Sequence, residues 1–213
     1  MNKRILLVGG GGHCKSVLDS LLAYDDFEIG IVDKEENIGN FVLGVPVLGC
    51  DNDLQHLYSM GYRNAFVTIG SIGNPRKRIE IFELLLKIGF EISNIIDPSA
   101  EVSKYADIDY GIFIGKKAVV NAGACIKRGS IINTGSIIEH DCQIGEFVHI
   151  APGTILGGRV KVGMNSHIGS NSTIIQNVKI GSNTIIGIGS VVTKSIGDSI
   201  MAYGNPCREV KKL

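Results

Sequence analysis

An aliphatic residue recurs at every sixth position between residues 102 and 192. Sixteen consecutive positions of this series carry Val, Ile or Leu: Val102, Ile108, Ile114, Val120, Ile126, Ile132, Ile138, Ile144, Ile150, Leu156, Val162, Ile168, Ile174, Ile180, Ile186 and Val192. Two residues before most of them the side chain is small, at Ala106, Ala118, Ala124, Ser130, Ser136, Cys142, Thr154, Ser166, Ser172, Thr184 and Ser190. Alternate residues of a strand share a face, so both sets are expected to point inward. Three such hexads make one coil of about eighteen residues, and the repeat predicts a parallel β-helix of about five coils.

Glycine often follows the repeated aliphatic residue directly, at positions 115, 145, 157, 163, 169, 181 and 187. We expect these glycines at the corners of the coils, where the backbone must be permissive.

The N-terminal part of the chain alternates strand and helix patterns. KRILLVG, FEIGIVD and NAFVTIG predict strands, and HCKSVLDSLLAY predicts a helix. A second helix is expected through RKRIEIFELLLKI, after Asn74-Pro75 and before Gly89. This order predicts an α/β, Rossmann-like domain over residues 1–92 and an all-β domain over residues 93–213.

Composition excludes several classes of function. The formal net charge is zero, so no global charge favours nucleic acid or an anionic membrane. No apolar stretch approaches the ~20 residues of a membrane span, and the N-terminal apolar run is too short for a signal peptide. The 5 cysteines are odd in number and form no CxxC motif. A reduced, cytoplasmic protein is the expectation.

His140 is the second residue after the inward Ile138, which places it at a corner of the β-helix, facing outward. One coil away lie Ala122 and Gly158, which would leave open space around the imidazole. Asp141 follows directly and could orient or charge-stabilise the ring as a general base. A solvated corner histidine fits the same pattern.

His149 comes nine residues after His140, half a coil further on. With a rise of about 3.3 Å per residue, the two rings would be roughly 15 Å apart on opposite sides of the prism. If both serve one site, that site lies between subunits, and a closed homotrimer is the simplest assembly.

His167 should stack on His149 in the adjacent coil. Such a pair is compatible with packing. It is also compatible with a zinc enzyme of the γ-carbonic anhydrase type, which shares three histidines across an interface, although the spacings here differ from that family's.

The hexapeptide pattern and the segment IIEHDCQIGEFVHIAPG, preceded by Asn133-Thr134-Gly135, resemble the sialic acid O-acetyltransferase and UDP-4-amino-sugar N-acetyltransferase family. The resemblance implies a left-handed β-helix and an acetyl-CoA-dependent enzyme of bacterial surface glycan biosynthesis. It implies His140 as general base, supported by Asp141, and contact of His149 with acetyl-CoA. By the same resemblance, the coenzyme site is lined by Gly158, Ser170, Gly187 and Ile188.

The segment VGGGGHCKSV follows a strand and opens a helix, where free backbone N–H groups favour phosphate. It does not match the dinucleotide fingerprint, and a tight strand-to-helix turn explains it equally well. By resemblance, Gly11, Gly12 and His13 contact the sugar nucleotide. Asp33 and Lys34, after the second strand, and Gly70, after the third, are expected in the same crevice. Lys34 departs from the paired acidic motif of the family.

Together these features predict direct acetyl transfer from acetyl-CoA to an amino or hydroxyl group of a nucleotide-linked sugar or sialic acid, with no metal required. Two alternatives remain open: a trimeric metalloenzyme, and a sugar-nucleotide-binding scaffold without catalysis. The C-terminal YGNPCREVKK either walls the coenzyme channel or covers the open end of the β-helix.

Overall fold

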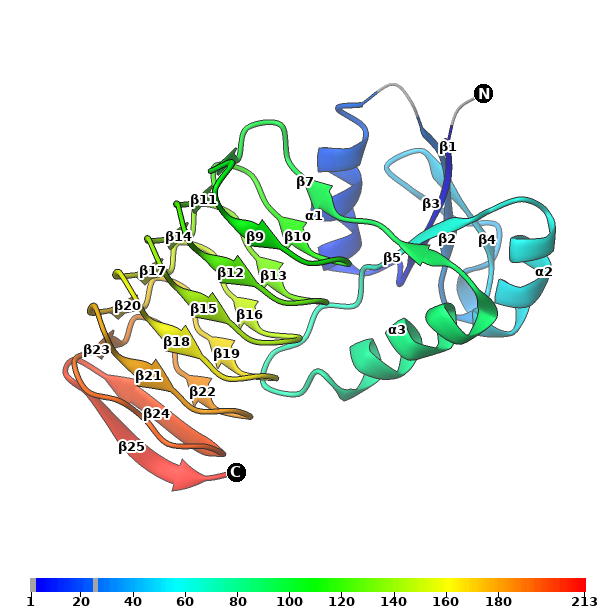
Figure 1. Ribbon diagram of the computed structural model, residues 1–213. Helices are drawn as coiled ribbons and strands as arrows, with labels where there is room; N and C mark the ends of the chain where they lie inside the picture. The colour runs from blue at the N-terminus through cyan, green and yellow to red at the C-terminus, as the bar shows by residue number, and fades with distance from the viewer. Residues whose placement is uncertain (1–2, 25–26) are drawn as a thin grey trace. The chain divides into compact units, whose positions relative to one another are not determined.

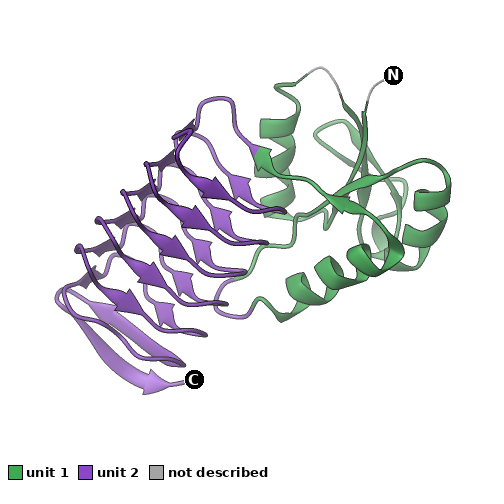
Figure 2. Cartoon of the chain, viewed as in Figure 1, with its two compact units in different colours: residues 1–71, 75–95 green, residues 72–74, 96–213 purple. Residues whose placement is uncertain are grey.

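The computed structural model describes residues 3–24 and 27–213. They form two compact units, one comprising residues up to 71 together with 75–95, and the other comprising 72–74 together with 96–213 (Figure 2). The domain boundary expected between residues 92 and 93 stays a prediction, and the compact units divide between residues 95 and 96.

The first unit is a six-stranded sheet with the strand order β3-β4-β2-β1-β5-β6 (Figure 1). The strands are β1 (Lys3–Val8), β2 (Phe27–Val32), β3 (Phe41–Val42), β4 (Val45–Gly49), β5 (Asn64–Val67) and β6 (Glu91–Ile92). Only β3 runs antiparallel to its neighbour among these described strands. The central β1 buries Ile5, Leu6, Leu7 and Val8, as expected of a parallel strand that is covered on both faces.

The helices of this unit are α1 (Gly12–Leu21), α2 (Leu54–Ser59) and α3 (Arg76–Ile88). α1 buries Cys14, Val17, Leu18 and Leu21, whose spacing of three and four residues makes one apolar stripe. α3 ends at Gly89, which takes the left-handed conformation that glycine tolerates best. The helices at HCKSVLDSLLAY and RKRIEIFELLLKI are therefore confirmed. The strand β4 and the helix α2 were not predicted.

The second unit is a prism of three parallel sheets. The histidine face comprises β7 (Ile95–Ile96), β10 (Phe113–Ile114), β13 (Ile131–Ile132), β16 (His149–Ile150), β19 (His167–Ile168) and β22 (Ile185–Ile186). The apolar face comprises β8 (Glu101–Val102), β11 (Val119–Val120), β14 (Ile137–Ile138), β17 (Ile155–Leu156), β20 (Thr173–Ile174) and β23 (Val191–Val192). The lysine face comprises β9 (Asp107–Ile108), β12 (Cys125–Ile126), β15 (Gln143–Ile144), β18 (Lys161–Val162) and β21 (Lys179–Ile180).

The predicted repeat is the core of this prism. Fourteen of the sixteen aliphatic residues are buried, and Val102 and Ile108 pack against them. Inward hydroxyls bond to carbonyls of the coil: Ser130 donates to Gly145 O over 2.9 Å, and Ser166 donates to Gly181 O over 2.7 Å. The small polar residues thus fill the corners without leaving a buried hydroxyl unsatisfied.

The repeated glycines do not have the permissive backbone conformation that we predicted for them. Those at 115, 145, 157, 163, 169, 181 and 187 do not have positive φ. They lie where the next coil comes closest, and a Cβ on Gly163 would lie 2.5 Å from the Ser182 nitrogen. The left-handed residue comes two positions later, at Gly111, Lys117, Gly123, Gly129, Gly135, Asp141, Phe147, Gly153, Arg159, Asn165, Asn171, Asn177, Asn183 and Gly189.

The C-terminal segment closes the end of the prism. β24 (Ile200–Gly204) pairs with β22, and β25 (Cys207–Lys212) pairs antiparallel with β24. Ile200, Ala202 and Cys207 are buried in the core cluster of the β-helix. The segment therefore covers the open end, one of the two roles that the sequence left open.

Candidate active site

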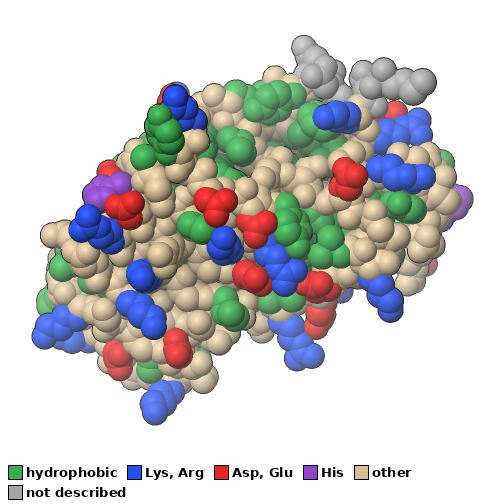
Figure 3. Space-filling model, in the orientation of Figure 1, with side chains coloured by type: hydrophobic (Ala, Val, Ile, Leu, Met, Phe, Trp, Pro, Cys, Tyr) green, Lys and Arg blue, Asp and Glu red, His purple; other side chains and the backbone are tan. Residues whose placement is uncertain are grey.

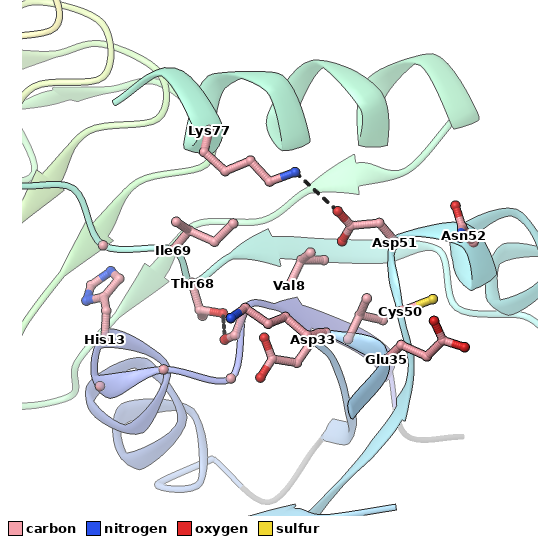
Figure 4. Close-up of a pocket in the computed structure, with 17 residues that line it drawn as sticks. Val8, His13, Asp33, Glu35, Cys50, Asp51, Asn52, Thr68, Ile69 and Lys77 are labelled. Atoms are coloured by element: carbon pink, nitrogen blue, oxygen red, sulfur yellow. Dashed lines mark hydrogen bonds and ion pairs between the residues drawn. The ribbon is translucent and has the colours of Figure 1, made fainter. Parts of the chain in front are cut away.

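All six residues predicted to bind the sugar nucleotide line one cavity of about 730 Å³ in the first unit (Figure 4). The loop between β1 and α1 supplies Gly11, Gly12 and His13, the segment after β2 supplies Asp33 and Lys34, and the end of the third predicted strand supplies Gly70. The cavity lies outside the carboxyl ends of the parallel strands, where open α/β sheets bind ligands.

The loop before α1 is shaped by contacts that only glycine permits. A Cβ on Gly10 would lie 2.6 Å from Asp33 Oδ2, and one on Gly9, at φ +113°, would lie 2.8 Å from Ile69 Cγ1. The Thr68 hydroxyl donates to Gly9 O over 2.5 Å. Held in this way, the loop leaves the N–H groups of the first turn of α1, whose N-cap Gly11 makes no side-chain cap, facing an anion-binding position.

Charged groups of both signs line the cavity. Asp33 accepts a hydrogen bond from Asn37 Nδ2 over 2.8 Å, and Lys77 lies 3.3 Å from Asp51. Burial, together with the charge of Arg78, lowers the pKa of His13 to about 4. His13 is thus a neutral imidazole at physiological pH, beside the positive end of the α1 dipole.

The sequence did not point to Cys50, Asp51, Asn52 or Lys77, which also line this cavity. The first three follow β4, and the segment GVPVLG was not recognised as a strand because it contains a proline. Lys77 lies in the first turn of α3, and the sequence placed this helix without indicating which face meets the sheet edge.

The predicted base lies at the corner between the apolar face and the lysine face. His140 Nδ1 is 2.9 Å from Asp141 Oδ2, and both side chains are about half exposed. The left-handed backbone of Asp141, at φ 60°, turns its carboxylate back toward the ring. Arg159, from the same corner of the next coil, brings Nε to 3.7 Å from the same carboxylate oxygen.

Gly158 is in direct contact with this imidazole. A Cβ on Gly158 would lie 2.5 Å from His140 Nε2, and one on Gly123 would lie 2.5 Å from Asp141 Oδ1. We expected open space around the His140 ring, but the ring lies directly over Gly158 and fills the space that the absent side chain leaves. The two glycines therefore permit the imidazole and the carboxylate to lie close to the coil.

The other residues predicted to bind the coenzyme lie elsewhere on the prism. His149 begins β16 on the histidine face, while Ser170, Gly187 and Ile188 lie in the turns that lead from this face to the apolar face. The His149 and His167 rings stack edge to face with centroids 4.9 Å apart, as the eighteen-residue spacing predicts. A single chain thus carries His140 at the corner opposite the histidine face, and it does not bring His140 and His149 together.

No group of three or more His, Cys, Asp or Glu side chains within residues 3–24 and 27–213 is arranged to hold a metal ion. In the same residues, no helix is long and apolar enough to cross a bilayer.

Comparison with known families and structures shows which proteins this chain is similar to. The PglD N-terminal domain matches residues 4–85, a bacterial transferase hexapeptide family of six repeats matches residues 141–176, and the hexapeptide repeat of succinyl-transferase matches residues 159–194. A crystal structure of perosamine N-acetyltransferase from Caulobacter crescentus, in which a histidine is replaced by asparagine, was solved with CoA and GDP-perosamine. It is 35% identical, with a TM-score of 0.91 over 98% of this chain and 97% of that one. The chain belongs to this family of hexapeptide-repeat sugar acetyltransferases.

Two further members of the family are similar to this chain. The acetyltransferase domain of PglB from Neisseria gonorrhoeae, solved with acetyl coenzyme A, is 34% identical, with a TM-score of 0.91 over 99% of this chain and 100% of that one. The GDP-perosamine N-acetyltransferase of Escherichia coli O157:H7 is 34% identical over 122 residues, which are 57% of this chain and 53% of that protein. The chain thus matches about half the length of this curated relative.

Family membership confirms several predictions. The fold is the predicted combination of a Rossmann-like domain and a left-handed β-helix. The enzyme class, an acyltransferase that uses acetyl-CoA, is also confirmed for the family.

Proposed function

We propose that this protein transfers the acetyl group of acetyl-CoA to the amine of a nucleotide-linked amino sugar. The observation that carries the proposal is the His140–Asp141 pair, with Nδ1 and the carboxylate 2.9 Å apart and Nε2 held over Gly158. A histidine whose one nitrogen bonds a carboxylate keeps a lone pair on the other nitrogen, as a general base requires.

In the proposed reaction, His140 Nε2 accepts a proton from the sugar amine while the amine nitrogen attacks the thioester carbonyl carbon. The new C–N bond forms as the carbonyl becomes an oxyanion, which backbone N–H groups or His149 stabilise. The C–S bond then breaks, and the departing CoA thiolate takes up the proton that His140 accepted, which returns the imidazole to its neutral form. Asp141 stabilises the imidazolium that His140 forms, and no acyl-enzyme is needed.

We place acetyl-CoA at the turns between the histidine face and the apolar face, near His149, Ser170, Gly187 and Ile188. In support, the Ile188 side chain is 75% exposed at these turns, so its apolar surface is available to a ligand or a second chain.

We place the nucleotide in the cavity at the first unit's sheet edge, with the diphosphate at Gly11, Gly12 and His13 and the ribose near Asp33. Lys34 and Gly70 would complete the walls. The relatives from Caulobacter crescentus and Escherichia coli act on GDP-perosamine, which favours a GDP-linked sugar over a UDP-linked one. Free sialic acid has no diphosphate to occupy the N-terminus of α1.

The corner that carries His140 and the turns that carry the proposed acetyl-CoA site can meet only between copies of the chain. We therefore propose a homotrimer with three shared sites. The apolar face supports this: its outward residues include Val119, Ile137, Ile155 and Val191, and Ile155 is 40% exposed. On the lysine face the corresponding residues include Gln143, Lys161 and Lys179, and basic side chains lie over β18 and β21 (Figure 3). Burying the apolar face brings His140 of one copy toward the histidine face of the next.

The test is release of free CoA thiol from acetyl-CoA with GDP-linked and UDP-linked amino sugars and sialic acid as acceptors. We expect turnover with a nucleotide-linked amino sugar and its loss in His140→Ala. Unchanged turnover in His140→Ala would contradict the mechanism. Nucleotide-sugar binding without thiol release from any acceptor would indicate a scaffold, and loss of activity with chelator would indicate the metalloenzyme.

A further inference from the structure

The side-chain amide of Asn133 has a fixed orientation. The residue follows β13 on the histidine face, and its backbone N–H donates to Ile150 O over 3.0 Å. The backbone N–H of Thr134 donates to Asn133 Oδ1 over 2.8 Å, and the Thr134 hydroxyl is 3.4 Å from the same oxygen. Because an N–H donor requires an acceptor, the amide oxygen must point toward Thr134 and the amide nitrogen must point the other way.

The amide nitrogen of Asn133 faces His149. Its distance to His149 Nε2 is 3.3 Å. An amide nitrogen carries two hydrogens and accepts none, so Nδ2 is the donor and Nε2 is the acceptor. The lone pair of Nε2 is therefore engaged, and the ring proton of His149 must be on Nδ1.

The packing of the ring keeps this arrangement in place. His149 is half-buried, and its ring meets the buried His167 ring edge to face at an interplanar angle of 74°. Rotation of the His149 ring by a half-turn would require both the Asn133 contact and this ring contact to be remade.

We propose that Asn133 is a positioning residue for acetyl transfer, holding His149 as the neutral tautomer that donates through Nδ1. This inference rests on the proposed function, in which His149 meets acetyl-CoA. It names Nδ1 as the atom that donates to the acetyl carbonyl oxygen as negative charge develops there, and it excludes His149 Nε2 as a second base. Proton removal and oxyanion stabilisation are thus divided between His140 and His149.

The tautomer can be measured directly in the intact protein. In ¹⁵N-histidine-labelled enzyme at neutral pH, with the His149 resonances assigned by their loss in His149→Gln, we expect a protonated, pyrrole-type Nδ1 and an unprotonated, pyridine-type Nε2. The reverse pattern, or an imidazolium, would overturn the inference without touching the proposed function.

The variant Asn133→Asp tests the role of the amide. One carboxylate oxygen can still accept from Thr134, but the other can only accept from His149, so the ring proton should move to Nε2. We expect kcat to fall about 100- to 1,000-fold, the scale of a lost oxyanion donor, with KM for the nucleotide sugar little changed. The control is Asn183→Asp, since Asn183 Oδ1 accepts from Asn165 Nδ2 over 3.1 Å, a role that aspartate keeps.

An unchanged tautomer in Asn133→Asp, or an altered tautomer with full kcat, would refute the positioning role. Full kcat in His149→Gln would instead overturn the placement of His149 at the acetyl group, and the proposed function would fail at that residue.

Discussion

At the scale of single residues, the geometry of the site requires glycine at three positions, because a Cβ atom there would collide with a functional side chain. Gly10, Gly123 and Gly158 each stand where a Cβ would collide with a carboxylate or an imidazole. The close approaches at Gly123 and Gly158 allow the conformation in which His140 Nδ1 lies 2.9 Å from Asp141 Oδ2. Functional groups at a corner with half-exposed side chains would otherwise sample several rotamers.

Gly158→Ala is expected to displace the His140 ring, because its Cβ would fall 2.5 Å from Nε2. Since a misplacement of about 1 Å can cost roughly 100-fold in rate, kcat should fall about 10- to 100-fold while the fold is kept. Steady-state kinetics check this. Gly197→Ala is the matched control, as its Cβ would meet only Ile200 Cγ1 at 3.9 Å, and an equal loss of kcat there would refute the explanation.

His13 should make stability depend on pH. Its pKa is about 4 in the folded protein against 6.5 for a free histidine, so between these values the unfolded chain binds a proton that the folded chain does not. The free energy of unfolding should therefore fall as pH drops from 6.5 toward 4. The ring is only half-buried, so we expect a loss of about 1–2 kcal/mol. Denaturant titrations of wild type and His13→Gln should show this slope only in the wild type.

At the scale of elements, the β-helix could be predicted far better than the site. The period of six indicated the strands, the core and the outward direction of His149, because a side chain in a strand has only two directions. It also placed His140 in a turn at a corner of the prism. The strand β4 and the residues after it were missed because Pro46 breaks the strand pattern. The contact of Asp141 with Arg159 could not be predicted, because it depends on the left-handed turn conformation of both residues, which the period of six does not indicate.

The stacking of coils explains the repeated glycines and gives a direct test. A Cβ on Gly163 would fall 2.5 Å from the Ser182 nitrogen and 2.6 Å from its hydroxyl oxygen, and the backbone of the next coil would have to move. Gly163→Ala should therefore lower the free energy of unfolding by about 1–3 kcal/mol, as overpacking usually does. Thermal denaturation measures this, and a melting temperature equal to that of Gly197→Ala would contradict the close-approach explanation.

At the scale of the whole molecule, two features of the single chain support the proposed trimer. The apolar face carries outward aliphatic side chains along several coils, whereas the lysine face is polar. His140 and His149 lie on opposite sides of the prism. The proposed closed trimer would bury the apolar face and bring His140 of one subunit near His149 of the next.

Ile155→Asp should disrupt this assembly, because it places a charge in the centre of the apolar face. Light scattering coupled to size exclusion should report a smaller species than the wild type, with loss of activity. Lys161→Asp, at the equivalent outward position of the lysine face, should leave the mass unchanged. A trimeric mass for Ile155→Asp, or a monomeric mass for the wild type, would show that the apolar face serves another purpose.

The most direct test of a site shared between subunits is to mix two inactive variants, His140→Asn and His149→Asn, in one trimer. Every mixed trimer contains one interface with both histidines intact, and random 1:1 assembly restores about one quarter of the sites. We predict that co-expression gives acetyl transfer at up to about one quarter of the wild-type rate, while each variant alone is inactive. Mixed trimers as inactive as their parents would contradict the account.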